Sequence, residues 1–485
     1  MSRLRHAHGA VLLLALVLAA CIAASFAALA LAARAATARD RATERALAQA
    51  REALIAYAVD RQINAATGPG YLPCPDLDGD GWAESTCGSL DGSTGQASRL
   101  GLLPWKTLGL PELRDGAGER LWYAVSTQYK GLLNCAASSA CVDMTPAHAP
   151  GTITVRAADG TVVHDGTAGT GAVAVVMAPG PPLERMEVDG DRLQERACAP
   201  GECDSDGVCI AAPPQRAAPC DPRNFLDRAP GAARPAEDNA DFIDRSDAPG
   251  RAQDSNGFIM GPVRGPGGRV AVNDRVVVVA YEDVMPRIMA RVALEVAQCM
   301  RFYATRPENG GRYPAPIAAC ARGPRFGMLP DTPFDTAASG MLARWWRTAA
   351  RTPESLAELP THDDACRLAV APDDPGPVRT YAPGIPASEG ETAAAPSWWR
   401  SWRLHVYASV AAGRAPSDAP NVDCAAAGAC VRLVDADARV LRDGQSAAIV
   451  VSTDCPGPDV CANDDCTTLV ASRNPRDLHA VAFVP

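Results

Sequence analysis

The sequence has none of the short motifs that mark common catalytic sites. No G-x-S-x-G nucleophile motif, H-E-x-x-H zinc motif or phosphate-binding P-loop occurs in its 485 residues. The seven histidines are scattered along the chain, and no arrangement of a nucleophile with a base is visible. We therefore expect a protein that is not an enzyme, with an envelope enzyme of unusual site as the last of three alternatives.

Basic runs and C-x-x-C pairs are missing as well. The net charge is −10, nearly all basic residues are arginine, and no basic run occurs outside the extreme N-terminus. An acidic surface argues against nucleic acid as a partner. Without C-x-x-C, the chain lacks the usual motif of zinc ribbons and thioredoxin-type redox sites.

Cysteine, in contrast, is abundant. One of the 17 cysteines, Cys21, lies in an apolar segment, which leaves an even number in the polar part. An even number of cysteines at short spacings, behind an export signal, indicates disulfides formed in an oxidising compartment. We single out six disulfide cysteines without assigning the full connectivity: Cys74, Cys87, Cys135, Cys141, Cys424 and Cys430.

One uncharged apolar segment occupies residues 10–33, and Arg3 and Arg5 precede it. As a helix it spans roughly 36 Å at ~1.5 Å per residue, enough to cross a ~30 Å hydrocarbon core. The positive-inside rule places residues 1–9 in the cytoplasm. We expect a single-pass protein of the bacterial inner membrane, with its C-terminal bulk in the periplasm or on the cell surface.

Three fates of this segment stay open. A cleaved secretory signal has a shorter apolar region than this one. Residues 18–21, LAAC, fit a bacterial lipobox, and lipidation of Cys21 would give an envelope lipoprotein or an anchored, adhesin-like binding module. A prepilin-like signal would be cut between Gly9 and Ala10 on the cytoplasmic side.

The apolar segment continues into a long amphipathic helix. Residues 34–62 contain no Gly or Pro, and Leu47, Ala50 and Leu54 recur at helical spacing. An unbroken helix from the membrane to about residue 62 would be about 75–80 Å long. A pilin needs such a rod; a membrane anchor with a helical stalk is the alternative.

The two halves of the polar part share an order of landmarks, in which a helix is followed by a Leu-Pro step, a strand, a C-x5-C pair and two further strands. We predict an α+β fold in which the long transmembrane helix continues into a pilin-like helix with an antiparallel sheet, followed by a second tandem module of the same kind. The predicted boundaries are a leader at 1–9, a transmembrane helix at 10–33, module 1 at 34–180, a Cys/Pro/Gly-rich connection at 181–270, and module 2 at 271–485 with an insertion at 341–400.

Residues 5–14, RHAHGAVLLL, resemble the start of minor pilins and general secretion pseudopilins. The order LPCPD, LPW, LWYAVS resembles a set of bacterial prepilin-like proteins. The main pilin class has Glu at the fifth mature position; here Leu14 stands there, which resembles the large tip pseudopilin. The resemblance implies a structural role in a type IV pilus or type II secretion system. Its partners would be the inner membrane, other pilin-like or secretion-system subunits, and a prepilin peptidase.

One acidic loop is the best candidate for a metal. Asp76, Asp78 and Asp80 are followed by Gly81, in the manner of the first half of an EF-hand, with Glu84 at the ninth position. The twelfth position, normally a bidentate Glu, is a cysteine. Pseudopilins of the kind this chain resembles can use calcium to hold a loop. We expect either a calcium site or an Asp/Gly turn held by a disulfide between Cys74 and Cys87.

Overall fold

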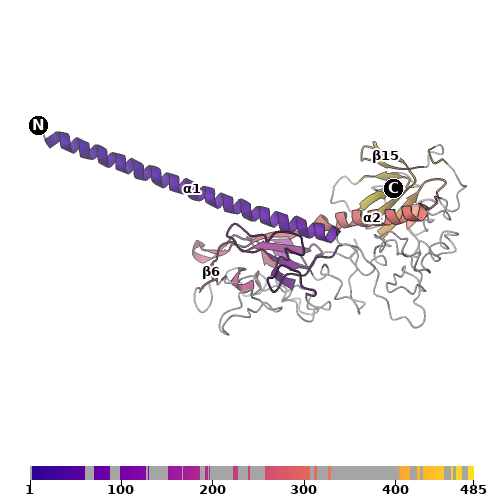
Figure 1. Ribbon diagram of the computed structural model, residues 1–485, viewed down its shortest axis with the longest axis horizontal. Helices are drawn as coiled ribbons and strands as arrows, with labels where there is room; N and C mark the ends of the chain where they lie inside the picture. Colours follow the sequence, from indigo (N-terminus) through magenta and orange to yellow (C-terminus); the bar gives the residue numbers. More distant parts are fainter. Residues whose placement is uncertain are drawn as a thin grey trace.

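The computed structural model is a mixed helix-and-sheet protein with one long N-terminal helix that projects from the folded part (Figure 1). The structure describes residues 3–60, 70–87, 99–126, 129, 151–166, 168–185, 192–194, 196, 222–227, 239–240, 257–305, 311–313, 326–328, 402, 405–414, 423–425, 430–452, 460–462, 466–471 and 479–484. The predicted insertion at 341–400 and the predicted disulfide cysteines Cys135 and Cys141 lie outside these residues.

Helix α1 (Arg3–Asp60) is continuous over 58 residues. Its length is about 87 Å at ~1.5 Å per residue. After Gly9 it contains no Gly or Pro and is rich in Ala, Leu and Arg, which are strong helix formers. The prediction of one long helix that runs on from the apolar segment is confirmed as far as Asp60, and its predicted end at about residue 62 lies outside the described residues.

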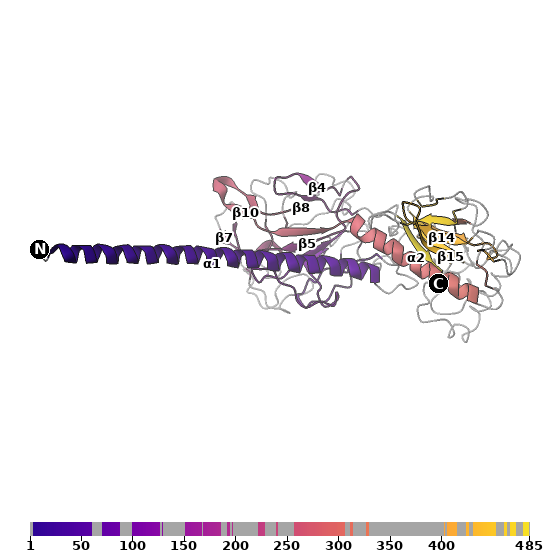
Figure 2. The same cartoon turned by 90° about the horizontal axis from the view of Figure 1, so that it is seen from above.

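The packed half of α1, residues 42–60, lies against the folded part, whereas residues 16–41 are exposed along their whole length (Figure 2). The buried side of the packed half includes Leu47, Ala50, Leu54 and Ala58, whose spacing of three or four residues places them on one helix face. These residues join the largest hydrophobic core of the described residues.

A four-stranded antiparallel sheet lies against this half of α1. Alternate residues of one strand face opposite sides, so Tyr123 and Val125 join the core under α1, while Trp122 and Ala124 join a second core on the far side. In spatial order the strands are β1 (Leu100–Leu102), β2 (Trp122–Val125), β5 (Ala174–Ala178) and β11 (Arg275–Val279).

The far side of this sheet is covered by a small three-stranded sheet and by a short 3-10 helix, η4 (Pro222–Asn224). The Phe225 ring lies tilted against the Trp122 ring, with 5.4 Å between the ring centroids, and Phe258 is fully buried in the same core. In this small sheet the central strand β3 (Val155–Arg156) pairs antiparallel with β4 (Val162–His164) and parallel with β8 (Phe258–Ile259).

Helix α2 (Tyr281–Thr305) starts one residue after β11 and packs against a second four-stranded antiparallel sheet. The Asp283 side chain accepts a hydrogen bond of 3.0 Å from the Ala280 amide at the start of the helix. Such a bond satisfies one of the free amides of the first turn. In spatial order the strands are β12 (Phe326–Met328), β13 (Val406–Val410), β16 (Ala447–Ser452) and β18 (His479–Phe483).

A second small sheet accompanies the second large one. Its central strand β14 (Val431–Val434) pairs antiparallel with β15 (Val440–Gln445) and parallel with β17 (Thr468–Val470). This is the same pairing that β3 makes with β4 and β8, and the strands occur in the same order along the chain. Two hairpins complete the described strands: β6 (Glu184–Arg185) with β7 (Arg192–Leu193), and β9 (Val263–Arg264) with β10 (Val270–Val272), the latter pair joined through η7 (Pro266–Gly268).

Strand β11 lies within the range that the sequence assigned to the second module, 271–485. It hydrogen-bonds to β5 over five residue pairs, from Arg275 with Ala178 to Val279 with Ala174. The first sheet therefore takes its last strand from residues beyond the connection. Strand β8, which falls inside the predicted connection at 181–270, likewise belongs to the first small sheet.

Candidate functional site

The acidic loop lies between Cys74 and Cys87 in the chain, and a disulfide joins these two cysteines. Two glycines shape it, because Gly79 and Gly81 adopt positive φ angles of 78° and 90°. Residues other than glycine rarely adopt such φ angles. At Gly81 a Cβ atom would also lie 2.6 Å from the indole nitrogen of Trp105, so the tryptophan ring packs directly on the loop.

Asp76 is the centre of the loop and is almost completely buried. Its Oδ1 accepts a hydrogen bond of 2.7 Å from the Gly79 amide, and its Oδ2 accepts one of 2.9 Å from the Gly81 amide. Its backbone exchanges hydrogen bonds with Leu102 in β1, which ties the loop to the sheet. Burial raises the pKa of Asp76 from 3.8 to about 7, although the two amides oppose the rise, and the charges of Asp78 and Asp80 add to it.

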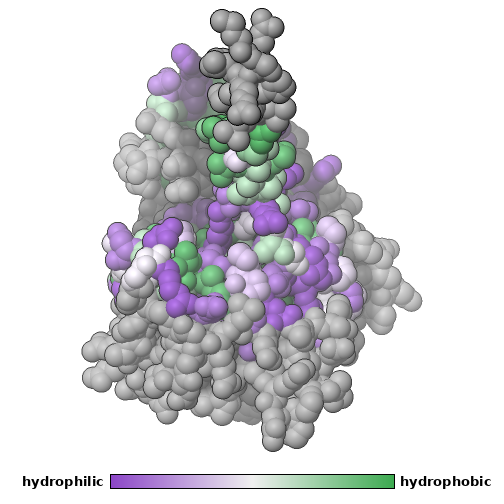
Figure 3. All heavy atoms as spheres, turned by 90° about the vertical axis from the view of Figure 1, so that its left-hand side faces the viewer, coloured by the Kyte–Doolittle hydropathy of each residue, from purple (hydrophilic) through white to green (hydrophobic). Residues whose placement is uncertain are grey.

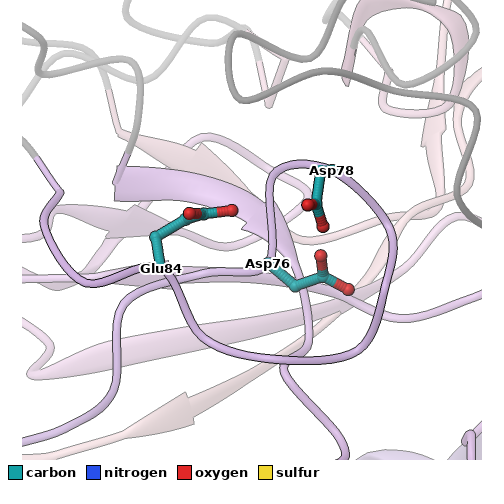
Figure 4. Close-up of side chains that lie close together, drawn as sticks. All are labelled: Asp76, Asp78 and Glu84. Atoms are coloured by element: carbon teal, nitrogen blue, oxygen red, sulfur yellow. The ribbon is translucent and has the colours of Figure 1, made fainter.

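Asp78 and Glu84 complete a group of three carboxyl groups (Figure 4). One oxygen from each of Asp76, Asp78 and Glu84 lies within 4.8 Å of the others. Glu84 accepts a hydrogen bond of 3.3 Å from the Leu77 amide, so the loop folds back on its own start. Burial raises the pKa of Glu84 above its ordinary value.

Asp80 was predicted as a fourth ligand, but the structure does not place it in this group. Its Oδ1 accepts a hydrogen bond of 2.7 Å from the Trp82 amide. Lys106 donates a hydrogen bond to the Asp80 carbonyl oxygen and lies over the Trp105 ring. The sequence spacing suggested that Asp76, Asp78 and Asp80 all act as ligands. In the structure, the Asp80 carboxylate instead accepts a hydrogen bond from the backbone of its own turn.

The donor set suits a hard cation. Calcium is bound by about six to eight oxygen atoms. Carboxylates supply some of these oxygens, and backbone carbonyls or water molecules can supply the rest. Cys87, at the position of the usual bidentate Glu, is in a disulfide and offers no ligand. The three carboxyl groups therefore fit one side of a calcium site rather than a full EF-hand.

Four of the six expected disulfide cysteines are paired in the structure, and the other two lie outside the described residues. Besides the Cys74–Cys87 bond, Cys424 pairs with Cys430, and Cys461 pairs with Cys466. The last pair was not singled out from the sequence; its short spacing before β17 was the available signal. Cys21, the alternative lipidation site, is an exposed free cysteine within α1.

Of the described helices, α1 alone is long and apolar enough to span a membrane. Its large apolar side chains are exposed, for example Leu16 at 63%, Phe26 at 68% and Leu31 at 65%. A core helix of a soluble protein would bury such residues. Single-pass anchoring through α1 agrees with this exposure. Gly9 and Ala10, the predicted processing residues, lie in the first turns of the same helix.

A second polar cluster was not predicted. Fully buried Asp274, just before β11, accepts hydrogen bonds of 2.8 Å from the Asp227 amide and from the Asn239 side chain. Asp227 in turn accepts bonds from Gln194 and from the Asn273 amide. Burial raises the pKa of Asp274 well above its ordinary value, and Asp227 adds to the rise. The cluster fastens the connection to the first sheet, and its members are too far apart in sequence for a motif to reveal it.

No protein-family model, curated protein or solved structure matches this chain.

Proposed function

We propose that the protein is a membrane-anchored extracytoplasmic assembly protein of the minor pilin or pseudopilin type, working in a type IV pilus or a type II secretion system. The observation that carries this proposal is α1. In its exposed half, residues 16–33 present apolar side chains, and its packed half, residues 42–60, lies on an antiparallel sheet. One continuous helix therefore joins a membrane-compatible segment rigidly to a folded body.

The two halves of α1 serve different contacts. In a membrane, the exposed half is solvated by lipid tails, which match its apolar side chains. In an assembled filament, the same side chains can pack against the helices of neighbouring subunits, because both environments exclude water. The packed half would hold the folded body at a fixed distance from that contact.

The matched order of strands supports a tandem of two such modules. In the first, α1 covers β1, β2, β5 and β11; in the second, α2 covers β12, β13, β16 and β18. The module boundary then falls at Ala280, between β11 and α2, rather than at residue 271. The second module has no membrane half, since α2 starts directly at the sheet.

Processing at Gly9–Ala10 belongs to this proposal. The fifth residue after that cut is Leu14, so the chain has no carboxylate there to pair with a neighbour's N-terminal amine. A subunit without this pairing suits a tip or accessory position rather than the shaft of a filament. The periplasm or cell surface is then the place of the folded part.

The test is the mass of the mature N-terminal peptide from protein made in its native host. A peptide that begins at Ala10, methylated at its amine, is the expected result. A Gly9→Leu variant should stay uncut, with Ser2→Ala as the matched control that is still processed. A diacylglyceryl group on Cys21 would contradict the proposal in favour of a lipoprotein, and an intact N-terminus would leave a simple single-pass anchor.

We further propose that the loop around Asp76 holds calcium. The support is the group of three carboxyl groups, of which Asp76 is buried. A bound divalent cation would let all three stay ionised and would fasten the loop to β1 through Asp76. Its part in the assembly would be structural, as a rigid loop on the first module.

A further inference from the structure

Three arginines form a row on α1 directly after its apolar part. Arg34 and Arg41 are seven residues apart, and Arg41 and Arg45 are four apart, so all three lie on one helix face. All three are exposed. The opposite face, which includes Ala46 and Ala50, is buried against the sheet. We call Arg34, Arg41 and Arg45 the arginine row.

The positive charge of this row is not neutralised within the described part of the chain. None of its three members forms an ion pair there, although the Arg45 side chain donates a hydrogen bond to the Arg41 carbonyl. The nearest acidic residues on α1, Asp40 and Glu44, lie 2.7 and 3.6 Å from the guanidinium nitrogens of Arg275 on β11. An excess of positive charge thus remains on this face of a chain whose net charge is −10.

The row begins at the end of the apolar segment. Arg34 follows Ala33 directly, and Arg41 lies about 12 Å beyond Ala33 along the helix axis at ~1.5 Å per residue. The headgroup layer of a bilayer is roughly 5–8 Å thick on each side. Arg41 and Arg45 lie beyond this layer, about 12 and 18 Å from Ala33 along the axis. Their side chains lean back toward the N-terminus, which keeps their charges within about a Debye length, roughly 10 Å at 0.1 M salt, of the headgroups. In Figure 3, green apolar residues of α1 give way to purple hydrophilic ones where the helix meets the folded part.

We propose that the arginine row binds the phosphates of anionic phospholipid headgroups in the leaflet nearest the folded part. A guanidinium group donates two parallel hydrogen bonds to a phosphate, which makes arginine well suited to this contact. The inference rests on the membrane anchoring in the proposed function and adds a ligand to it. Headgroups bound to the arginine row would fix how far α1 emerges from the membrane. The opposite face of α1, which packs on the sheet, would then point away from these headgroups.

Spin-labelled lipids test this contact on the full chain in phosphatidylcholine membranes. Electron paramagnetic resonance separates lipid that is motionally restricted beside the protein from free lipid. We expect restricted phosphatidylglycerol to be favoured over restricted phosphatidylcholine by at least about two-fold, since one arginine near a membrane surface is worth about a five-fold preference. High salt should remove the preference, because surface charges are screened.

The decisive variant is R34Q/R41Q/R45Q. It should lose the preference for phosphatidylglycerol over phosphatidylcholine, while the total amount of motionally restricted lipid stays the same. The matched control is R301Q/R439Q/R442Q, which removes the same charge from exposed arginines of the second half of the protein and should behave as wild type. An unchanged preference in R34Q/R41Q/R45Q would overturn the proposal and assign the lipid preference to other charges.

The experiment also separates this inference from the anchoring on which it rests. Complete absence of restricted lipid around the wild-type chain would contradict the membrane span itself. Restricted lipid without any preference for phosphatidylglycerol would leave the span intact and refute the lipid contact. Loss of assembly in R34Q/R41Q/R45Q without a change in lipid preference would overturn the proposal in favour of an acidic protein surface as the occupant of the row.

Discussion

The acidic loop makes a prediction that can be worked out from Asp76. Its pKa in the folded protein is about 7, compared with 3.8 ordinarily, because the carboxyl group is buried. Between these two pH values the unfolded chain has released a proton that the folded chain still holds. Without a cation, the stabilisation present below about pH 4 is therefore lost as the pH rises to about 7.

The size of this effect follows from the shift. A rise from 3.8 to about 7 is a change of about 3 units, or about 4 kcal/mol at ~1.4 kcal/mol per unit. A bound cation reverses part of this loss, since it favours the ionised carboxylate. Loops of extracellular type bind calcium with Kd values of roughly 0.1–1 mM. At 10 mM calcium the gain in the free energy of unfolding is then about 1.4–2.7 kcal/mol.

Thermal unfolding of the full chain in detergent, with EDTA or with 10 mM calcium, measures this gain. We expect an increase in Tm at pH 8 that becomes much smaller at pH 5, where a proton occupies Asp76. Each kcal/mol corresponds to about 2–4 °C for a domain of this size. Magnesium is the control for a general ionic effect, because it requires a stricter octahedral geometry.

Two matched variants decide which carboxylates take part. Asp78→Asn and Asp80→Asn remove the same charge two residues apart, and an Asn Oδ1 can still accept the local amide bond in each case. Asp78→Asn should abolish the calcium effect, whereas Asp80→Asn should retain most of it. Equal Tm values with EDTA and calcium in the wild-type chain at pH 8 would refute the calcium site, and equal losses in the two variants would refute the assignment of ligands.

Two further predictions concern stability. Leu54→Ala, at a fully buried position of α1, should lower the free energy of unfolding by about 2–5 kcal/mol in a urea titration, while Leu441→Ala, at a position that is 56% exposed, should change it little. Asp274→Asn should flatten the pH dependence of stability. Burial raises the pKa of Asp274, so the wild-type protein loses stability as the pH rises above the ordinary value of 3.8. A neutral amide at this position removes that loss. If the slope of unfolding free energy against pH between pH 5 and 9 is the same in the variant, Asp274 is not the group responsible.

The long helix was predictable because its signals are local. Absence of Gly and Pro after Gly9, together with an apolar run, suffices to specify a continuous helix whatever it packs against. The central strands were predictable for a similar reason: the buried runs at 174–178 and 447–452 are rich in Val and Ala. Short strands such as β8, with two residues, carry too little pattern to be found.

The acidic loop was predictable in composition and only partly in geometry. Alternation of Asp76, Asp78 and Asp80 suggested three ligands on one side of a loop. Which of them converge depends on the turn itself, and the Trp82 amide holds the third carboxylate. The cluster around Asp274 depends on contacts between distant parts of the chain, which no single segment of the sequence encodes.

The position of β11 has a consequence for how the two large sheets are joined. Only Ala280 separates the last strand of the first sheet from α2, so there is no linker about which the second sheet could swing. The largest hydrophobic core is shared, since it includes Leu54 of α1, Val279, Ile288 of α2 and Ile449 of the second sheet. Arg51 of α1 also pairs with Asp283 of α2 at 2.6 Å. A force applied along α1 would therefore reach the second sheet through packed side chains, which the proposed tip or accessory role would require.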